Sequence, residues 1–252
     1  FVLLFIIAYI LIRGIPCLKL DMFTTLEFNT ENLSMLPAII NTVTMTLLSL
    51  LVALPIGVFS AVYLVEYAKR GSKLTSVIRI TTETLSGIPS IVYGLFGYLL
   101  FVIALHWGYS LIAGVLTLAI MILPTIISVS ESSIRAVPES YYEGALALGA
   151  THERAVFAVS LKAAKSGILA AIILGVGRAV GETMAVIMVA GNQARLAGGV
   201  LDGVRTMTAN IVLEMGYAAD LHREALISTA VVLFVFILLI NLAFSAVKRH
   251  AK

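Results

Sequence analysis

The sequence predicts an all-α, polytopic membrane protein with six transmembrane helices. Of its 252 residues, 60% are hydrophobic and 12% are charged, and the mean hydropathy is +1.04. Soluble domains carry about 25% charged residues, so this chain has too few charges for a soluble fold. A helix needs about 20 apolar residues to cross the hydrocarbon core of a bilayer, and six candidate segments follow one another along the chain.

The six predicted spans are separated by polar segments or by turns that contain Gly or Pro. They cover residues 1–12, 36–64, 87–105, 111–129, 167–190 and 225–247. Residues 1–12 have the character of the second half of a span, and Phe1 is not an initiator Met, so we expect a trimmed N-terminus. A signal peptide is disfavoured because no small-residue cleavage site follows the apolar run. We treat residues 1–252 as one transmembrane domain.

The basic residues predict how the chain is oriented in the membrane. Most of them lie after the second span, after the fourth span and in the C-terminal tail: Lys69, Arg70, Lys73, Arg79, Arg135, Arg154, Lys162, Lys165, Lys248, Arg249 and Lys252. The positive-inside rule therefore places these two loops and the C-terminus in the cytoplasm. The net charge of +3 reflects this grouping and does not indicate a nucleic-acid partner.

Residues 138–162 form a polar insert between two apolar spans, and their pattern predicts a helix, a turn and a second helix. Pro138 is suited to the start of a helix, where its missing N–H costs nothing. Glu139 and Glu143 follow in the first turns, where the helix dipole favours negative charge. Gly149 interrupts the pattern, and an apolar face at helical spacing resumes afterwards. Nearby, Glu131 and Arg135 lie four residues apart and are expected to pair.

This insert resembles the cytoplasmic signature of permeases from ATP-driven importers. That signature reads Glu-Ala-Ala, three residues, Gly, nine residues, and then Ile-x-Leu-Pro. Glu143, Ala145, Gly149 and Leu161 match it at the same spacing. Three positions depart from it: Gly144, Val159 and Lys162. The resemblance implies that residues 138–162 form a coupling helix that docks into a cleft of an ATP-binding subunit. The alternative is a solvated loop helix without a partner.

Two ionisable residues interrupt the apolar span at residues 167–190. Arg178 and Glu182 are four residues apart, which on a continuous helix puts them on one face and within pairing distance. Charged residues inside a membrane span are costly and normally face the bundle interior or an aqueous path. Arg178 therefore is a candidate for an anion path, with Glu182 as its partner or as an acceptor for a protonated oxyanion. The alternative is an internal salt bridge that fixes helix packing.

Four segments strengthen the first interpretation, because they are similar to the phosphate-specific transporter permeases. They are residues 87–94, 121–127, 178–185 and 204–209. The form Gly-Glu-Thr-Met-Ala-Val at residues 181–186 favours the C-type of the family's two related subunits. The resemblance implies import of inorganic phosphate delivered by an external binding protein. It also implies that Arg178, Glu182 and Thr183 belong to the phosphate pathway, and that a sister permease completes a heterodimer.

Catalytic and metal-binding motifs are missing from the sequence. It contains no Gly-x-x-x-x-Gly-Lys-Ser/Thr loop, so the resemblance assigns ATP and Mg to the partner ATPase and no cofactor to this chain. Neither His-Glu-x-x-His nor Gly-x-Ser-x-Gly occurs, which disfavours an intramembrane enzyme. The four His residues are scattered, so no metal site is predicted, and the lone Cys17 cannot form an internal disulfide.

The sequence thus predicts a permease subunit of a phosphate importer in the cytoplasmic membrane of a prokaryote. Two alternatives remain open: an ATP-independent anion carrier or channel, and an importer permease for another oxyanion. Carriers of the first kind often contain inverted repeats, and none is visible here.

Overall fold

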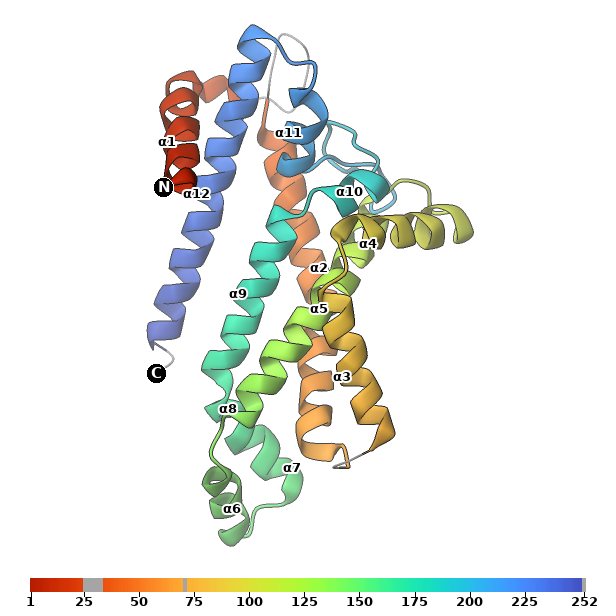
Figure 1. Ribbon diagram of the computed structural model, residues 1–252, viewed down its shortest axis with the longest axis vertical. Helices are drawn as coiled ribbons and strands as arrows, with labels where there is room; N and C mark the ends of the chain where they lie inside the picture. The colour runs from red at the N-terminus through yellow and green to blue at the C-terminus, as the bar shows by residue number, and fades with distance from the viewer. Residues whose placement is uncertain (25–33, 70–71, 251–252) are drawn as a thin grey trace. The chain divides into compact units, whose positions relative to one another are not determined.

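The computed structural model describes residues 1–24, 34–69 and 72–250 of the chain. Two of the basic residues used for the orientation, Arg70 and Lys252, lie outside the described residues. Across the described ranges the chain is mostly helical and contains no β-strand, and an isolated parallel bridge joins Gly191 and Val204 (Figure 1). The predicted all-α class is therefore confirmed for this part of the chain.

Twelve α-helices are described, together with two 3-10 and three π-helical segments. The α-helices are α1 (Val2–Gly14), α2 (Leu36–Val62), α3 (Lys73–Ser86), α4 (Ser90–Gly97), α5 (Leu111–Arg135), α6 (Glu139–Ala147), α7 (His152–Ala155), α8 (Leu161–Ala163), α9 (Lys165–Gly181), α10 (Met184–Val189), α11 (Met207–Met215) and α12 (Asp220–His250). The 3-10 segments are η1 (Ile15–Cys17) and η2 (Leu20–Phe23), and the π segments are η3 (Tyr63–Tyr67), η4 (Tyr98–Ala104) and η5 (Val156–Ser160).

Three described helices are long and apolar enough to cross a membrane: Leu36–Tyr67, Leu111–Arg135 and His222–Ala243. They coincide with the predicted spans at residues 36–64, 111–129 and 225–247. Two further spans arise if each of two broken helix pairs is one span, Lys73–Ser86 with Ser90–Ala104 and His152–Ala163 with Lys165–Gly181. The described residues therefore contain three to five candidate spans, and Val2–Cys17 is a shorter apolar helix.

The sequence interpretation of residues 69–79 as a basic loop is wrong for α3, which begins at Lys73. The helix is amphipathic with its polar face turned inward: Thr75 and Thr82 are buried, whereas Leu74 and Val77 are exposed. Hydropathy misses such a helix because its Thr, Ser and basic residues lower the average over any window. It ends at Ser86 because Pro89 lacks an N–H group and disfavours helical geometry in the residue before it.

Contacts between Cα atoms divide the chain into two compact units. The first unit consists of Phe1–Ser49, Pro89–Leu118 and Ala179–Ile240, and the second unit of Leu50–Ile88, Ala119–Arg178 and Asn241–Lys252.

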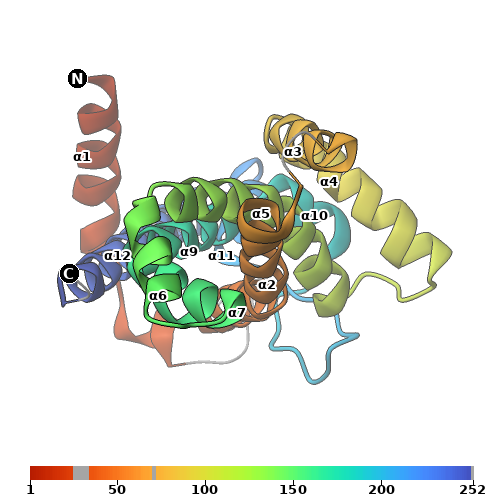
Figure 2. The same cartoon turned by 90° about the horizontal axis from the view of Figure 1, so that it is seen from below.

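In the first unit, glycines allow two pairs of helices to approach closely. At Gly14, α1 lies against Ile227 and Val231 of α12, and the Ser228 hydroxyl donates a 2.9 Å hydrogen bond to the Gly14 carbonyl (Figure 1). A Cβ at Gly94 of α4 would lie 2.8 Å from the Cα of Ala185 in α10, and these two helices are neighbours in Figure 2. Small residues at such crossings permit the close packing on which membrane bundles depend.

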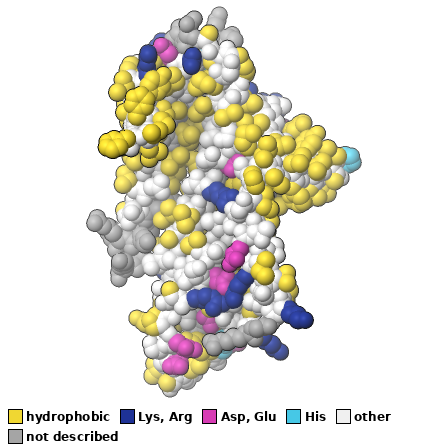
Figure 3. All heavy atoms as spheres, in the orientation of Figure 1, with side chains coloured by type: hydrophobic (Ala, Val, Ile, Leu, Met, Phe, Trp, Pro, Cys, Tyr) yellow, Lys and Arg dark blue, Asp and Glu magenta, His cyan; other side chains and the backbone are white. Residues whose placement is uncertain are grey.

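The outer surface of α4 and η4 is apolar. Its exposed large side chains are Ile91, Val92, Leu95, Phe96, Leu99 and Ile103. Figure 3 shows the corresponding hydrophobic side chains gathered over this segment. Such a surface is unfavourable in water, which agrees with the prediction of a membrane protein.

In the second unit, a small buried cluster joins the ends of α2 and α5 to the segment after α6. Its buried members are Ala61, Val62, Ile134, Val156 and Ala164, and around them pack the half-buried side chains of Val65, Val137, Tyr142, Leu161 and Ile168. The contact between Gly57 and Ile126 brings α2 against α5 in the same unit, and that between Gly167 and Ser133 brings α9 against α5.

Candidate functional site

The polar insert at residues 138–162 folds as its sequence predicts. Pro138 caps α6, whose first residue is Glu139, and all nine residues of this helix are described, none of them buried. A turn follows, and the chain becomes helical again at His152. The helix–turn–helix prediction is therefore confirmed within the second unit.

Gly149 ends α6 because its backbone lies in the left-handed region, with φ at +85°. The N–H of Ala150 donates to the carbonyl of Ala145 at 3.1 Å, and the N–H of Gly149 donates to the carbonyl of Leu146 at 2.9 Å. This pair of hydrogen bonds is the Schellman arrangement, which satisfies the last carbonyls of a helix and favours Gly at the left-handed position.

The helix after the turn begins with a polar cap. The Thr151 hydroxyl accepts a hydrogen bond from the Arg154 N–H at 3.4 Å, as expected of Thr at an N-cap. Hydrogen bonds from its own backbone N–H and from Thr151 hold the pKa of Glu153 below its ordinary value. The two caps fix the turn between α6 and α7 from both sides.

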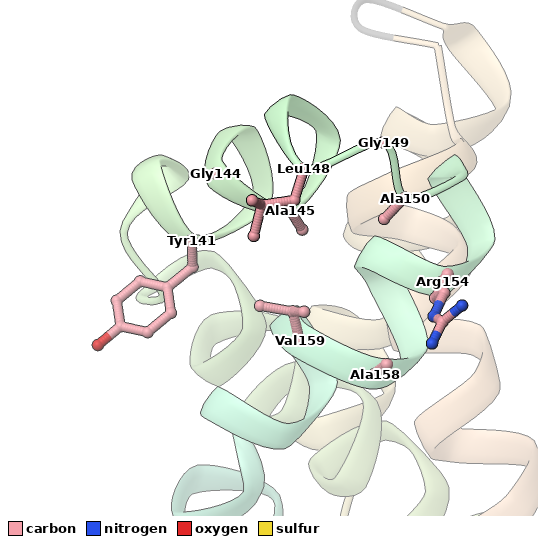
Figure 4. Close-up of a pocket in the computed structure, with 9 residues that line it drawn as sticks. All are labelled: Tyr141, Gly144, Ala145, Leu148, Gly149, Ala150, Arg154, Ala158 and Val159. Carbon is pink, nitrogen blue, oxygen red and sulfur yellow. The ribbon is translucent and has the colours of Figure 1, made fainter.

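An open groove of about 570 Å³ lies between α6 and the segment that follows the turn. Its lining is mostly small or apolar, and the residues are Tyr141, Gly144, Ala145, Leu148, Gly149, Ala150, Arg154, Ala158 and Val159. In Figure 4, Ala145 of α6 and its C-cap residue Leu148 lie across the groove from Val159 of η5, with Arg154 at its far side. Leu148 is 91% exposed, an unusual position for Leu in a polar segment.

The four residues predicted to couple to an ATPase occupy three different places. Ala145 and Gly149 line the groove. Glu143 is exposed on α6, outside the groove lining. Leu161 packs beside the buried cluster of the second unit, so its position is that of a packing residue at the base of the insert.

The predicted pair of Glu131 and Arg135 is confirmed, with 3.1 Å between Oε1 and the Arg135 Nε. Arg79 of α3 joins the same carboxylate oxygen at 2.9 Å, so one half-buried Glu holds two guanidinium groups. This third member could not be predicted, since Arg79 lies 52 residues before Glu131 on a segment interpreted as a loop. The triad fixes α3 against α5 near the insert.

Arg178 lies in the last turn of α9, half-buried. Its Nη1 donates a hydrogen bond of 3.2 Å to the hydroxyl of Thr125, which follows Pro124 in α5. In the described part of its own unit, no carboxylate forms an ion pair with Arg178. A guanidinium carries five N–H donors, so this cation keeps capacity for a further acceptor.

Glu182 does not continue the helix that carries Arg178, so the predicted shared helical face is wrong. The helix α9 ends at Gly181, and Glu182 and Thr183 form a break before α10 begins at Met184. The Glu182 Oε1 accepts a hydrogen bond from the Ala185 N–H at 3.0 Å, and the Thr208 hydroxyl donates to the Glu182 carbonyl at 2.8 Å. Glycine has a low helix propensity, and these side-chain bonds stabilise the interruption.

Thr183 occupies the N-cap position of α10, with φ at −124°. Its hydroxyl donates a 3.4 Å hydrogen bond to the carbonyl of Gly181. Its own carbonyl accepts the first helical hydrogen bond, 2.9 Å from the Ile187 N–H. Thr183 is therefore held in the same break as Glu182.

A buried ion pair that the sequence interpretation missed lies in the first unit. Arg205 Nη1 is 2.6 Å from Glu214 Oε1, and the two side chains are 15% and 9% exposed. Arg205 also donates to Asn210 Oδ1 at 3.1 Å and to the Asn192 carbonyl at 2.9 Å. The nine-residue spacing of the pair matches no helical periodicity. The sequence does carry a signal for the helix that holds Glu214: Thr206 is a suitable N-cap residue, and it caps α11.

Comparisons with known proteins match most of the chain. The family model described as "Binding-protein-dependent transport system inner membrane component" matches residues 53–252. The probable ABC transporter permease protein YqgH of Bacillus subtilis is 36% identical over 247 residues, covering 92% of this chain and 79% of that protein.

Two further relatives are named as phosphate transport proteins. The phosphate transport system permease protein PstC of Mesorhizobium japonicum is 33% identical, covering 84% of this chain and 72% of that protein. The phosphate transport system permease protein PstA 2 of Mycobacterium bovis is 41% identical over 154 residues, which are 61% of this chain. The chain spans half the length of that second relative.

Solved structures share the fold at low sequence identity. An inward-facing MetNI methionine ABC transporter chain aligns with a TM-score of 0.65 and 18% identity over 98% of both chains. A chain of a bacterial ABC transporter involved in alginate import aligns with a TM-score of 0.69 and 16% identity, over 97% of this chain and 88% of that one.

Proposed function

This chain belongs to the family of binding-protein-dependent transport system inner membrane components, and we propose that it is the membrane-spanning permease subunit of an ATP-driven importer of inorganic phosphate. It is a transport subunit and not an enzyme. The relatives named as phosphate transport permeases support phosphate as the cargo. The observation that carries the proposal is Arg178, a half-buried cation that donates a hydrogen bond to the neutral Thr125 and forms no ion pair with a described carboxylate of its unit.

The proposed phosphate path contains Arg178, Glu182 and Thr183. A guanidinium suits a tetrahedral oxyanion because its planar donors match two oxygens and its charge persists at any physiological pH. Glu182 and Thr183 follow within five residues, in a break where irregular backbone is stabilised by side-chain hydrogen bonds. Such breaks at membrane depth are tolerated where they line a cavity, which supports a position on the path.

The proposed topology has six spans in one permease domain of residues 1–252, with the C-terminus in the cytoplasm. The five candidate spans and the short apolar helix Val2–Cys17 together give six. The family model runs through both compact units, which supports a single domain. The basic residues on either side of the insert favour a cytoplasmic position for it.

The proposed coupling element is the insert at residues 138–162, with Glu143, Ala145, Gly149 and Leu161 as its signature residues. It would dock on an ATP-binding subunit that holds ATP and Mg, while this chain binds no cofactor. The open groove beside α6 and the nearly fully exposed Leu148 support a protein partner, since both leave apolar surface in contact with water. Movement of this insert would then expose the path alternately to the two sides of the membrane.

The proposed assembly contains further partners. A sister permease subunit, with this chain as the C-type member, would complete a heterodimer around the path. An extracellular or periplasmic phosphate-binding protein would deliver the anion, in agreement with the family description. Residues 191–224, which include α11, are the proposed outer docking surface.

Anion competition in the reconstituted complex tests the choice of cargo. Labelled phosphate uptake should be blocked by excess arsenate, which can be protonated like phosphate, and be unaffected by equal sulfate. A fully deprotonated sulfate cannot donate a hydrogen bond to the Glu182 carboxylate, so the site should discriminate against it. Equal competition by sulfate would favour the alternative of a permease for another oxyanion.

A further inference from the structure

The helix α6 is attached to its unit by few side chains. Of its nine residues, seven are exposed, and Tyr142 and Ala145 are half-buried. The Ala side chain offers one methyl group, so the ring and the hydroxyl of Tyr142 make the larger attachment. The ring packs beside the buried cluster that contains Val62, Ile134 and Val156.

The hydroxyl of Tyr142 forms a hydrogen bond with Nδ1 of His152, the first residue of α7, at 2.8 Å. The two rings also meet edge to face, with centroids 5.8 Å apart and planes at 80°. On the other side, Tyr67 at the end of η3 meets the His152 ring at 5.0 Å and 74°. Edge-to-face contacts of this geometry are favourable for aromatic rings. His152 therefore links α6 to the end of the long helix Leu36–Tyr67.

A polar cavity of about 650 Å³ lies beside Tyr142 and His152. Tyr142 and His152 line it together with charged residues of the neighbouring elements: Glu66, Lys69, Arg79, Arg135 and Glu139. The cavity gives α6 room to shift on this side, because it is open space lined mostly by polar side chains. The attachment of α6 to the helix end thus depends on the aromatic contacts at the edge of the cavity.

We propose that Tyr67, Tyr142 and His152 form an aromatic clasp, a set of positioning residues through which displacement of α6 is passed to the helix Leu36–Tyr67. The inference rests on the proposed function, in which α6 receives the force from an ATP-binding subunit. Energetic coupling needs a continuous chain of packed and hydrogen-bonded groups, and the clasp supplies one at the point where α6 has few other contacts. Without it, α6 would move into the cavity and the displacement would be absorbed.

Two variants remove the hydrogen bond while they keep an aromatic ring, Tyr142→Phe and His152→Phe. The matched control is Tyr63→Phe, which removes the same hydroxyl from an exposed tyrosine one turn before Tyr67. The first measurement is amide hydrogen exchange of residues 139–147 in the purified full chain. The loss of one hydrogen bond should speed exchange there by about two- to tenfold in both variants. The double variant should exchange little faster than either single variant, and the control should exchange at the wild-type rate.

The second measurement is phosphate imported per ATP hydrolysed by the reconstituted complex with its ATP-binding subunits. The proposal expects this ratio to fall at least about twofold in both clasp variants, while co-purification of the ATP-binding subunits stays at the wild-type level. A purely structural role would lower the amount of complex and leave the ratio unchanged.

The outcomes separate the clasp from the proposed function. Faster exchange with an unchanged ratio overturns the coupling role and leaves the importer intact. Exchange that equals the wild type in both variants overturns the clasp itself. A wild-type complex that hydrolyses ATP without phosphate uptake overturns the proposed function together with the coupling role, whatever the exchange shows.

Discussion

Arg178 donates a hydrogen bond of 3.2 Å to the hydroxyl of Thr125, which joins the last turn of α9 to the proline-containing stretch of α5. Thr125 is uncharged, so this contact orients the guanidinium without neutralising it. A charge held in this way in an apolar helix is costly unless it faces a polar path or an anion. The relationship leads to the first prediction.

Replacing Arg178 by Gln should lower phosphate uptake at least about tenfold, because hydrogen bonds to charged groups are worth about 1.5–3 kcal/mol. Assembly with the ATP-binding subunits and basal ATP hydrolysis should be retained. The control is Arg13→Gln, which removes an exposed cation at the end of α1. Uptake of labelled phosphate by the reconstituted complex is the measurement. If the complex no longer assembles, Arg178 has a packing role and the assignment to the path fails.

Glu182 should tolerate the loss of its charge better than the loss of its side chain. In Glu182→Gln the amide oxygen can still accept the hydrogen bond from the Ala185 N–H, so the thermal midpoint should stay close to the wild type. In Glu182→Ala this acceptor is lost, and the cost should be about 1 kcal/mol, as for other helix caps. Phosphate uptake should fall in both variants. Normal uptake by Glu182→Gln would show that the carboxylate serves the backbone alone.

Replacing Gly by Ala should change the stability of the insert in opposite directions at two of its glycines. A Cβ meets no atom within 4 Å at Gly144 or at Gly149, so packing does not decide the outcome. Gly149→Ala should destabilise the turn by about 1–2 kcal/mol because its φ of +85° is unfavourable for Ala. Gly144→Ala should stabilise α6 by about 0.5–1 kcal/mol through helix propensity. Hydrogen exchange of residues 139–150 measures both, and faster exchange in Gly144→Ala would contradict the account.

Reversing the charge at Glu143 should weaken binding of the ATP-binding subunit. Glu143 is exposed at the centre of α6, so Lys at this position would reverse the charge that the helix presents to a docked partner. The affinity of the ATP-binding subunit for Glu143→Lys should fall by about two- to fivefold, since an exposed charge contact is worth about 0.2–1 kcal/mol. The control is Glu83→Lys on the exposed surface of α3. Equal co-purification of both variants would count against docking through α6.

The apolar spans and the insert were predictable because their patterns are local. Hydropathy locates the three long helices, and the left-handed turn at Gly149 follows from a glycine between two helical patterns. The groove beside α6 could not be predicted, because it depends on the angle between α6 and η5. The spacing of residues in the sequence carries no information on that angle.

Three features escaped prediction for physical reasons. The helix α3 was interpreted as a loop because a membrane helix is expected to be apolar on both its buried and its exposed faces, whereas α3 buries polar side chains. The break at Glu182 was missed because a four-residue spacing of opposite charges suggests one continuous helix. The pair of Arg205 and Glu214 was missed because the two residues do not share a helix: α11 begins between them, so helical spacing does not predict their contact.

ATP dependence of phosphate uptake tests the central claim most directly. The chain is reconstituted into proteoliposomes with its sister permease and the external binding protein, with and without the ATP-binding subunits, and labelled phosphate entry is measured with ATP supplied on the cytoplasmic side. The account predicts uptake only when the ATP-binding subunits and ATP are both present. Uptake at the same rate without the ATP-binding subunits would contradict it and would identify a self-sufficient anion carrier or channel.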